Sequence, residues 1–178
     1  MGIIESFGST LEKVSDGLKE NRIANFKKTF LHSLSLEKIE PRHISTINES
    51  LEGQKIKDIP YTKRVFVLNG EKVEGVFPEF NSKYDVKLPE NLYKASDNEQ
   101  MKYCTKELGK KIDNNSELGE KFTARQLEQI RNSEPRISGL TWHHTEIPGK
   151  MQLVDAVDHS TARHTGGRSI WGGGSENR

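Results

Sequence analysis

Histidines that could form a metal or catalytic site gather near the end of the printed sequence. The chain has six histidines, and four of them fall within one short stretch: His143, His144, His159 and His164. Neutral imidazole is a good ligand for zinc and for late first-row divalent cations. An imidazole that binds no metal can take a proton from water. Hydrolysis of a phosphodiester needs both roles, and structural or surface histidines are the alternative interpretation.

The segments around these histidines predict a strand, a turn, a return strand and a short helix. The expected ranges are residues 137–145, 148–149, 151–154 and the helix that follows. Asp155 or Asp158 can cap that helix, which should carry His159 and His164 and end at Gly166-Gly167. Because neighbouring residues of a strand point to opposite faces, His143 and His144 can divide the work of metal binding and proton transfer.

The spacing of the last two histidines is unusual for one helix. Residues five apart are separated by about 140° around an ideal α-helix. His159 and His164 therefore cannot both face one metal as easily as an i, i+4 pair. We expect His164 either to lie just beyond the end of the helix or to contact substrate.

Other elements should form the frame that positions this unit. A hairpin is expected over residues 64–77, because Asn69-Gly70 suits a two-residue type I′ turn. Capping boxes that start at Ser96 and Thr123 predict helices over residues 97–112 and from 123 to about 133. Apolar periodicity predicts one or two amphipathic helices over residues 8–34. Residues 37–60 and 78–92 should be loop-rich or irregular.

Composition narrows the possible classes of protein. The chain has 178 residues, is 32% hydrophobic and 30% charged, and carries a net charge of +1, so a nucleic-acid site would have to be local. The lone cysteine, Cys104, excludes an intramolecular disulfide and a Cys-rich zinc site, and its place on an apolar stripe predicts a buried, inert thiol. No apolar run of about 18 residues predicts a membrane span, and the start of the chain lacks the features of a signal peptide.

Several motifs resemble those of one nuclease family. The sharpest motifs are Trp142-His143-His144, Gly149-x-Met151-Gln152-Leu153-Val154, His159-Ser160 and His164-Thr165-Gly166-Gly167. They resemble the WHH branch of the HNH/endonuclease VII nucleases, which are C-terminal toxin domains of bacterial polymorphic toxin systems. The resemblance is sharp over residues 135–174 and looser over residues 50–134, where residues 75–80 and 121–130 are also similar. Before about residue 45 there is no resemblance.

The resemblance implies a role for each histidine. His143 would be a catalytic metal ligand, His144 the general base that activates water, and His159 and His164 the remaining ligands. It implies one divalent ion, with zinc expected and magnesium, manganese or nickel as alternatives. HNH motifs usually carry a central Asn, but this chain has none between His144 and Asn177; Gln152 or Asp155 could substitute. Trp142 should pack in the core. Arg163, Arg168 and Lys150 flank the motifs and are candidate phosphate-binding residues.

The sequence therefore predicts an α+β fold with two parts. Residues 1–45 would be a helical segment or a remnant of a parent chain, and residues 46–178 a nuclease toxin domain with a ββα-metal core at about 138–167. We expect a metal-dependent DNA endonuclease that a cognate immunity protein neutralises. It would be secreted or delivered within a larger toxin, act in the cytoplasm of a target bacterium, and insert into no membrane. An RNase toxin of the same fold and a non-catalytic, zinc-stabilised binding module are the alternatives.

Overall fold

The computed structural model describes Arg22, Asn25 and residues 40–177. The chain divides into two units, residues 1–40 and 41–178. In the first unit Arg22 and Asn25 are helical, and the rest of the helices expected over residues 8–34 lies outside the described residues. The division expected near residue 45 stays a prediction. Among the described residues no helix has the length and hydropathy of a bilayer span.

A long hairpin forms most of the first sheet. Strands β3 (Ile59–Leu68) and β4 (Glu71–Pro78) are joined by Asn69 and Gly70, whose φ angles of 52° and 83° are those of the expected type I′ turn. Short strands β1 (Arg42–His43) and β2 (Lys55–Ile56) complete the sheet in the order β1-β4-β3-β2. A short 3-10 helix, η1 (Glu49–Leu51), lies between them in sequence.

The second sheet contains the predicted strand–turn–strand unit. Strands β6 (Leu140–His144) and β7 (Lys150–Asp155) pair antiparallel, with His143 opposite Gln152. On the other side of β7 lies β5 (Tyr84–Lys87), in a region that was expected to be irregular. The sheet order β5-β7-β6 makes β6 an edge strand. Side chains on both of its faces can therefore reach the same edge of the sheet.

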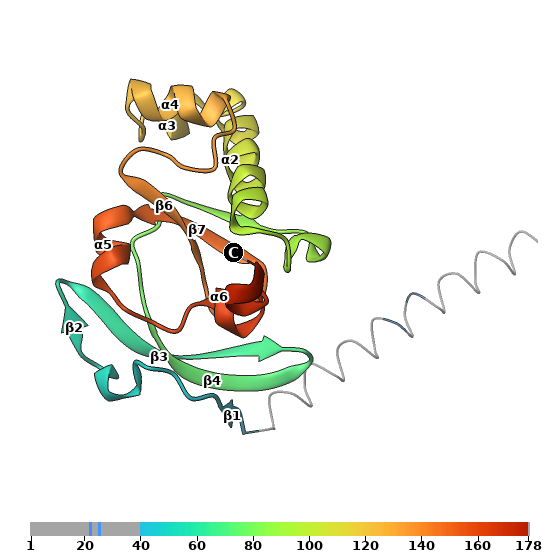
Figure 1. Cartoon of the computed structure of the whole chain (residues 1–178), viewed down its shortest axis with the longest axis vertical. Coiled ribbons are helices and arrows are strands. Elements are labelled where there is room, and N and C mark those ends of the chain that lie inside the picture. The colour runs from blue at the N-terminus through green and yellow to red at the C-terminus, as the bar shows by residue number, and fades with distance from the viewer. Residues whose placement is uncertain (1–21, 23–24, 26–39, 178) are drawn as a thin grey trace, which may run out of the picture. The chain divides into compact units, whose positions relative to one another are not determined.

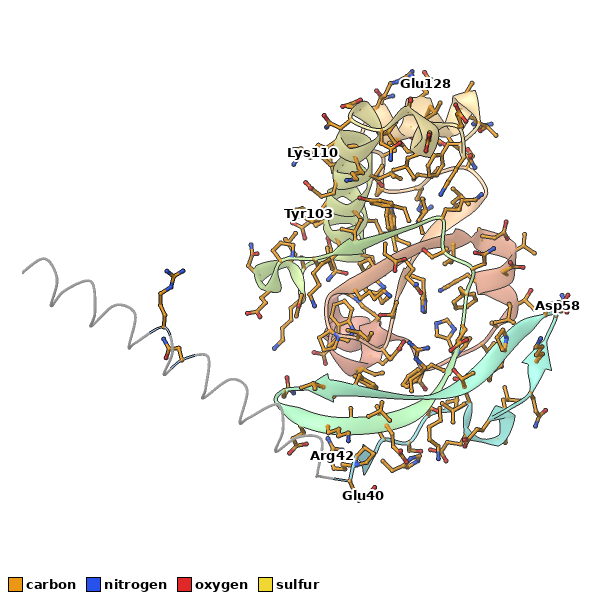
Figure 2. All side chains as sticks on the ribbon, turned by 180° about the vertical axis from the view of Figure 1, so that it is seen from behind. Glu40, Arg42, Asp58, Tyr103, Lys110 and Glu128 are labelled. Atoms are coloured by element: carbon orange, nitrogen blue, oxygen red, sulfur yellow. The ribbon has the colours of Figure 1, made fainter. Side chains whose placement is uncertain are left out.

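Helices cover one face of this second sheet (Figure 1). The two predicted capping boxes are confirmed, because Ser96 and Thr123 each accept a hydrogen bond from the backbone N–H three residues later. They start α2 (Asp97–Asp113) and α4 (Ala124–Arg131), with the unpredicted α3 (Ser116–Gly119) between them. Figure 2 shows Tyr103 and Lys110 along α2, and Glu128 on α4.

The main core lies between α2 and the second sheet. Trp142, Met151 and Leu153 from the strands pack in one cluster with Cys104 and Leu108 from α2. Cys104 is fully buried, as predicted, and burial raises the pKa of its thiol to about 12. The indole N–H of Trp142 donates to Oγ1 of Thr105 on α2 at 3.0 Å, so Trp142 is a core residue, as predicted.

The opposite face of β7 packs against the first sheet. Val154 joins a cluster with Tyr61 and Val76 of the hairpin and with Ala162. Helix α5 (Ala156–Thr161) follows β7 directly and completes a ββα unit, and α6 (Gly167–Ile170) comes next. The expected end of the helix at Gly166-Gly167 is wrong. The chain leaves α5 after Thr161, and Gly166 is instead the N-cap of α6. The α+β class is confirmed.

Candidate active site

Three histidines from the ββα unit come together. His143 comes from β6, His159 from α5, and His164 from the loop after α5. One ring nitrogen from each lies within 4.8 Å of the corresponding nitrogens of the other two. This is the only such cluster of three or more His, Cys, Asp or Glu side chains among the described residues. We call these three residues the histidine trio.

Local structure explains how the trio is assembled. The carboxylate of Asp155 caps α5 by accepting from the backbone N–H groups of Val157 and Asp158, at 2.8 and 3.1 Å. This cap fixes the start of the helix that carries His159. His164 lies beyond the helix end, which was one of the two expected arrangements. Its Nδ1 is 2.6 Å from the carbonyl oxygen of Ala162, so Nδ1 carries the hydrogen and Nε2 is the nitrogen that can bind a metal.

Phe80, just after β4, forms one wall of the trio. Its ring centroid lies 4.8 Å from that of His143, 5.4 Å from that of His159 and 5.6 Å from that of His164. The Phe80 side chain is itself buried. A rigid aromatic ring in contact with all three imidazoles limits their rotation and excludes water from that side.

Burial keeps the trio neutral. It lowers the pKa of His143 well below the usual value, and the charged forms of His164 and His159 lower it further. Burial, followed by the charge of His164, lowers the pKa of His159 to about 4. Burial also lowers the pKa of His164, although the bond to Ala162 opposes the shift. Neutral imidazole is the form that binds metal, so the donor set fits a divalent ion.

His144 points to the other face of β6, toward α2. Its Nε2 lies 2.6 Å from Oε1 of Gln100. The amide nitrogen of Gln100 donates to the carbonyl oxygens of Leu92 and Tyr93 at 2.7 and 2.8 Å, which fixes the orientation of the amide. Oε1 must therefore be the acceptor, and a neutral His144 carries its hydrogen on Nε2 and its lone pair on Nδ1.

A buried cation supports the same amide. Arg168, on α6, donates from Nη1 to Oε1 of Gln100 at 3.2 Å and to the carbonyl oxygen of Ala95 at 3.0 Å. Its Nε lies 3.0 Å from Oδ1 of Asp97. The Arg168 side chain is 6% exposed. This geometry gives Arg168 a place in the support of His144, whereas the sequence motif suggested a contact with phosphate.

All four motif histidines line one cleft of about 620 Å³. Because β6 is an edge strand, the trio on one face and His144 on the other both border it. Arg163 and Arg168 also line it, and Arg163 is exposed. Lys150, the third candidate phosphate contact, lines a separate pocket and pairs with Asp85 at 3.0 Å. The structure thus brings together two of the three basic residues that the sequence singled out.

The two candidates for the missing central Asn have other partners. Gln152 donates to Asp85 at 3.2 Å, and the carboxylate of Asp155 caps α5. The side chain next to His144 is Gln100, 44 positions earlier in the sequence. Sequence reasoning missed it, because a glutamine inside an amphipathic helix carries no motif. Its one signal was its place one residue after the Glu99 of the capping box.

The fold and the histidine cluster define the class of the protein as a ββα-metal nuclease domain of the toxin type. The chain belongs to the DNase/tRNase domain family of colicin-like bacteriocins, whose family model matches residues 69–166. No curated protein and no solved structure matches the chain. The matched range includes Gln100 and all four histidines of the cleft, and it begins directly after the end of β3.

Proposed function

We propose that this chain is a metal-dependent endonuclease that hydrolyses DNA and acts as an antibacterial toxin. The observation that carries the proposal is that the neutral histidine trio and His144 line the same cleft. Family membership supports phosphodiester hydrolysis, and its description covers both DNA and tRNA as substrates. An RNase that uses the same histidines is therefore the second candidate.

The trio would hold one divalent ion through His143, His159 and His164. Three imidazoles without a thiolate suit zinc, with magnesium, manganese and nickel as alternatives. The ion would polarise an oxygen of the scissile phosphate and stabilise negative charge on the leaving oxygen. The neutral state of the three imidazoles, which burial imposes, keeps them ready to bind.

His144 would act as the general base. Because Nε2–H of His144 donates to Gln100, Nδ1 of His144 would take the proton from the attacking water. Gln100, fixed by two backbone carbonyls and by Arg168, would hold the imidazole in that orientation. Arg163, exposed at the cleft, would bind a phosphate of the substrate backbone. Lys150 lines another pocket and pairs with Asp85, so we assign it no phosphate contact.

Two alanine variants test the proposal. His143→Ala should abolish cleavage of plasmid DNA and weaken zinc affinity in isothermal titration. His144→Ala should lower the cleavage rate by about 10²–10⁴-fold while zinc still binds. A non-catalytic, zinc-stabilised module predicts no cleavage by the parent chain in the first place. Parent-rate cleavage by metal-loaded His144→Ala would show that another group is the base, and faster cleavage of RNA than of DNA would favour the second candidate.

We also propose that a cognate immunity protein covers the cleft in the producing cell. A cell that makes a nuclease of its own nucleic acid needs such an inhibitor. The toxin, alone or within a larger protein, would be released by the producing cell and delivered to the cytoplasm of a target bacterium. Survival of cells that express His144→Ala, set against death of cells that express the parent chain without the inhibitor, would support this role.

A further inference from the structure

The third ligand of the trio stands where no regular element holds it. Helix α5 ends at Thr161 and α6 begins at Gly167, so His164 lies in the loop between them. Its ring is tied to the carbonyl oxygen of Ala162. The direction in which Nε2 points therefore depends on how the backbone of residues 162–165 is fixed.

The side chain of Asn48 holds that backbone on both sides of His164. Its Nδ2 donates to the carbonyl oxygen of Arg163 at 2.6 Å, and its Oδ1 accepts from the backbone N–H of Thr165 at 3.1 Å. Asn48 is 1% exposed. The single planar amide of Asn48 thus bonds the carbonyl group of the residue before His164 and the N–H group of the residue after it. No other residue type of this size offers a donor and an acceptor in that arrangement.

Neighbouring groups strengthen the same clamp. The backbone N–H of Ile47 donates to Oγ1 of Thr165 at 3.2 Å. On the other side, Oγ1 of Thr46 donates to the carbonyl oxygen of Val76 in β4 at 3.1 Å. The segment that carries Asn48 is therefore fixed to the hairpin, and the hairpin in turn positions the loop of His164.

We propose that Asn48 is a positioning residue for the metal site, which acts by fixing the backbone around His164. The inference rests on the proposed function of the trio. Asn48 lies 115 positions before Arg163 and precedes the range that the family model matches. Outer groups that orient metal ligands typically contribute 10- to 100-fold to metal affinity. The contribution of Asn48 should appear in metal binding itself, before any substrate is present.

The test compares two variants of the same segment by titration of the whole chain with zinc alone. Asn48→Ala removes both bonds to the loop, and we expect zinc affinity to fall by about 10- to 100-fold. Thr46→Val is the matched comparison, because it removes the bond to Val76 and the contact with the Asn48 backbone N–H and leaves the side-chain bonds of Asn48 to Arg163 and Thr165. We expect Thr46→Val to lower the melting temperature of the metal-free protein and to lower zinc affinity much less than Asn48→Ala does.

A double-mutant cycle separates positioning from general destabilisation. If Asn48 acts through His164, then Asn48→Ala in a His164→Ala background should cause no further loss of zinc affinity. An equal loss in both backgrounds would overturn the inference. So would parent affinity in Asn48→Ala, or a loss in Thr46→Val as large as that in Asn48→Ala.

A second variant covers the case in which Asn48→Ala does not fold. Asn48→Asp keeps the shape of the side chain and the acceptor for the Thr165 N–H but removes the donor to the Arg163 carbonyl oxygen, and we expect an affinity loss of about 2- to 10-fold, the range that one hydrogen bond supplies. Parent affinity in a folded Asn48→Asp would then overturn the inference. A parent chain that binds no zinc at all, nor magnesium, manganese or nickel, would instead overturn the proposed function, so the two failures are distinguishable.

Discussion

Gln100 fixes which nitrogen of His144 carries the hydrogen, and therefore which nitrogen would act as the base in the proposed mechanism. Its amide oxygen accepts from His144 and from Arg168, at 2.6 and 3.2 Å. Gln100→Leu keeps the approximate shape of the side chain and removes the amide oxygen that accepts the hydrogen bond from Nε2 of His144. We expect the cleavage rate to fall by a factor no larger than the roughly 10²–10⁴-fold that a general base supplies, with zinc affinity unchanged.

The control for this prediction is Gln126→Leu, which removes a glutamine amide from the capping box of α4. Both variants should lose stability, because each leaves backbone groups without a partner, at roughly 1–3 kcal/mol for a buried one. Only Gln100→Leu should lose activity beyond the fraction of unfolded protein. Parent-like kcat in Gln100→Leu at a temperature where it is folded would remove Gln100 from the mechanism.

The two basic residues Arg163 and Lys150 should differ in their contribution to DNA binding. Arg163 is exposed at the cleft, whereas Lys150 is paired with Asp85 at another pocket. Each phosphate contact adds about 0.9 to the slope of log K against log salt for duplex DNA. In the cleavage-deficient His144→Ala background, Arg163→Ala should reduce that slope by roughly 1. Lys150→Ala should leave it unchanged, and the reverse order would place the DNA on the other pocket.

At the residue scale, the sequence could reveal the histidines but not the groups that orient them. His143, His144, His159 and His164 form a compact pattern within the ββα unit, and their types already limit the chemistry. Gln100 lies 44 positions from His144 in the sequence, and Asn48 lies 115 positions from Arg163, its partner beside His164. An isolated glutamine or asparagine has no periodicity or spacing to mark it, and only the packing of distant segments brings it to the site.

At the scale of elements, α6 depends on a glycine that lets it approach the backbone of Thr145, the residue directly after β6. A Cβ built on Gly167 would lie 1.9 Å from the carbonyl oxygen of Thr145 and 2.4 Å from Nε1 of Trp171. Gly167→Ala should push α6 outward and destabilise the fold by about 1–3 kcal/mol, the usual cost of overpacking. Because Arg168 follows on the same helix, its bonds to Ala95 and Gln100 should weaken too.

Gly109→Ala offers a matched control on α2. A Cβ there would meet Ile130 at an ordinary 3.5 Å. Alanine is the better helix former by about 0.5–1 kcal/mol, so we expect Gly109→Ala to be neutral or stabilising. Urea unfolding of both variants would compare the two. Equal stability of Gly167→Ala and the parent chain would mean that the close contact between Gly167 and Thr145 does not constrain α6.

The elements with local signals were predicted well, and those that depend on distant pairing were not. The type I′ turn and both capping boxes are short-range hydrogen-bonding patterns, and all three are confirmed. Strand β5 was missed because its four residues gain their conformation from pairing with β7. The end of α5 was placed too late, because Gly166-Gly167 resembles a C-terminal cap but serves the start of α6.

At the scale of the whole molecule, the class of fold followed from the order of local patterns, while the relation of the two sheets did not. Val154 of β7 packs with Tyr61 and Val76 of the hairpin. This contact, together with the bonds of Ile47 and Asn48 to residues 163 and 165, brings the segment of Asn48 to the ββα unit. The expected loop-rich region over residues 37–60 therefore contributes to the site through tertiary packing that no single segment encodes.

The buried trio should make the metal-free protein sensitive to acid. Burial lowers the pKa of His143, His159 and His164 in the folded state, to about 4 for His159, whereas an unfolded histidine titrates near 6.5. Below about pH 6.5 the unfolded chain thus binds more protons than the folded one, and the free energy of unfolding decreases as pH falls toward 4. Each such histidine contributes at most about 1.4 kcal/mol per pH unit.

Bound zinc should stabilise the folded protein at neutral pH, and this stabilisation should disappear in acid. A ligand at 100 times its Kd adds about 2.7 kcal/mol to the free energy of unfolding, but protons compete for the same nitrogens. We expect urea unfolding to show a large zinc effect at pH 7.5 that shrinks toward pH 5. His159→Gln should reduce the acid slope of the metal-free protein, whereas His43→Gln, at an exposed pair with Glu49, should retain it. A metal-free stability that stays constant from pH 7.5 to 5 would contradict a neutral, buried trio.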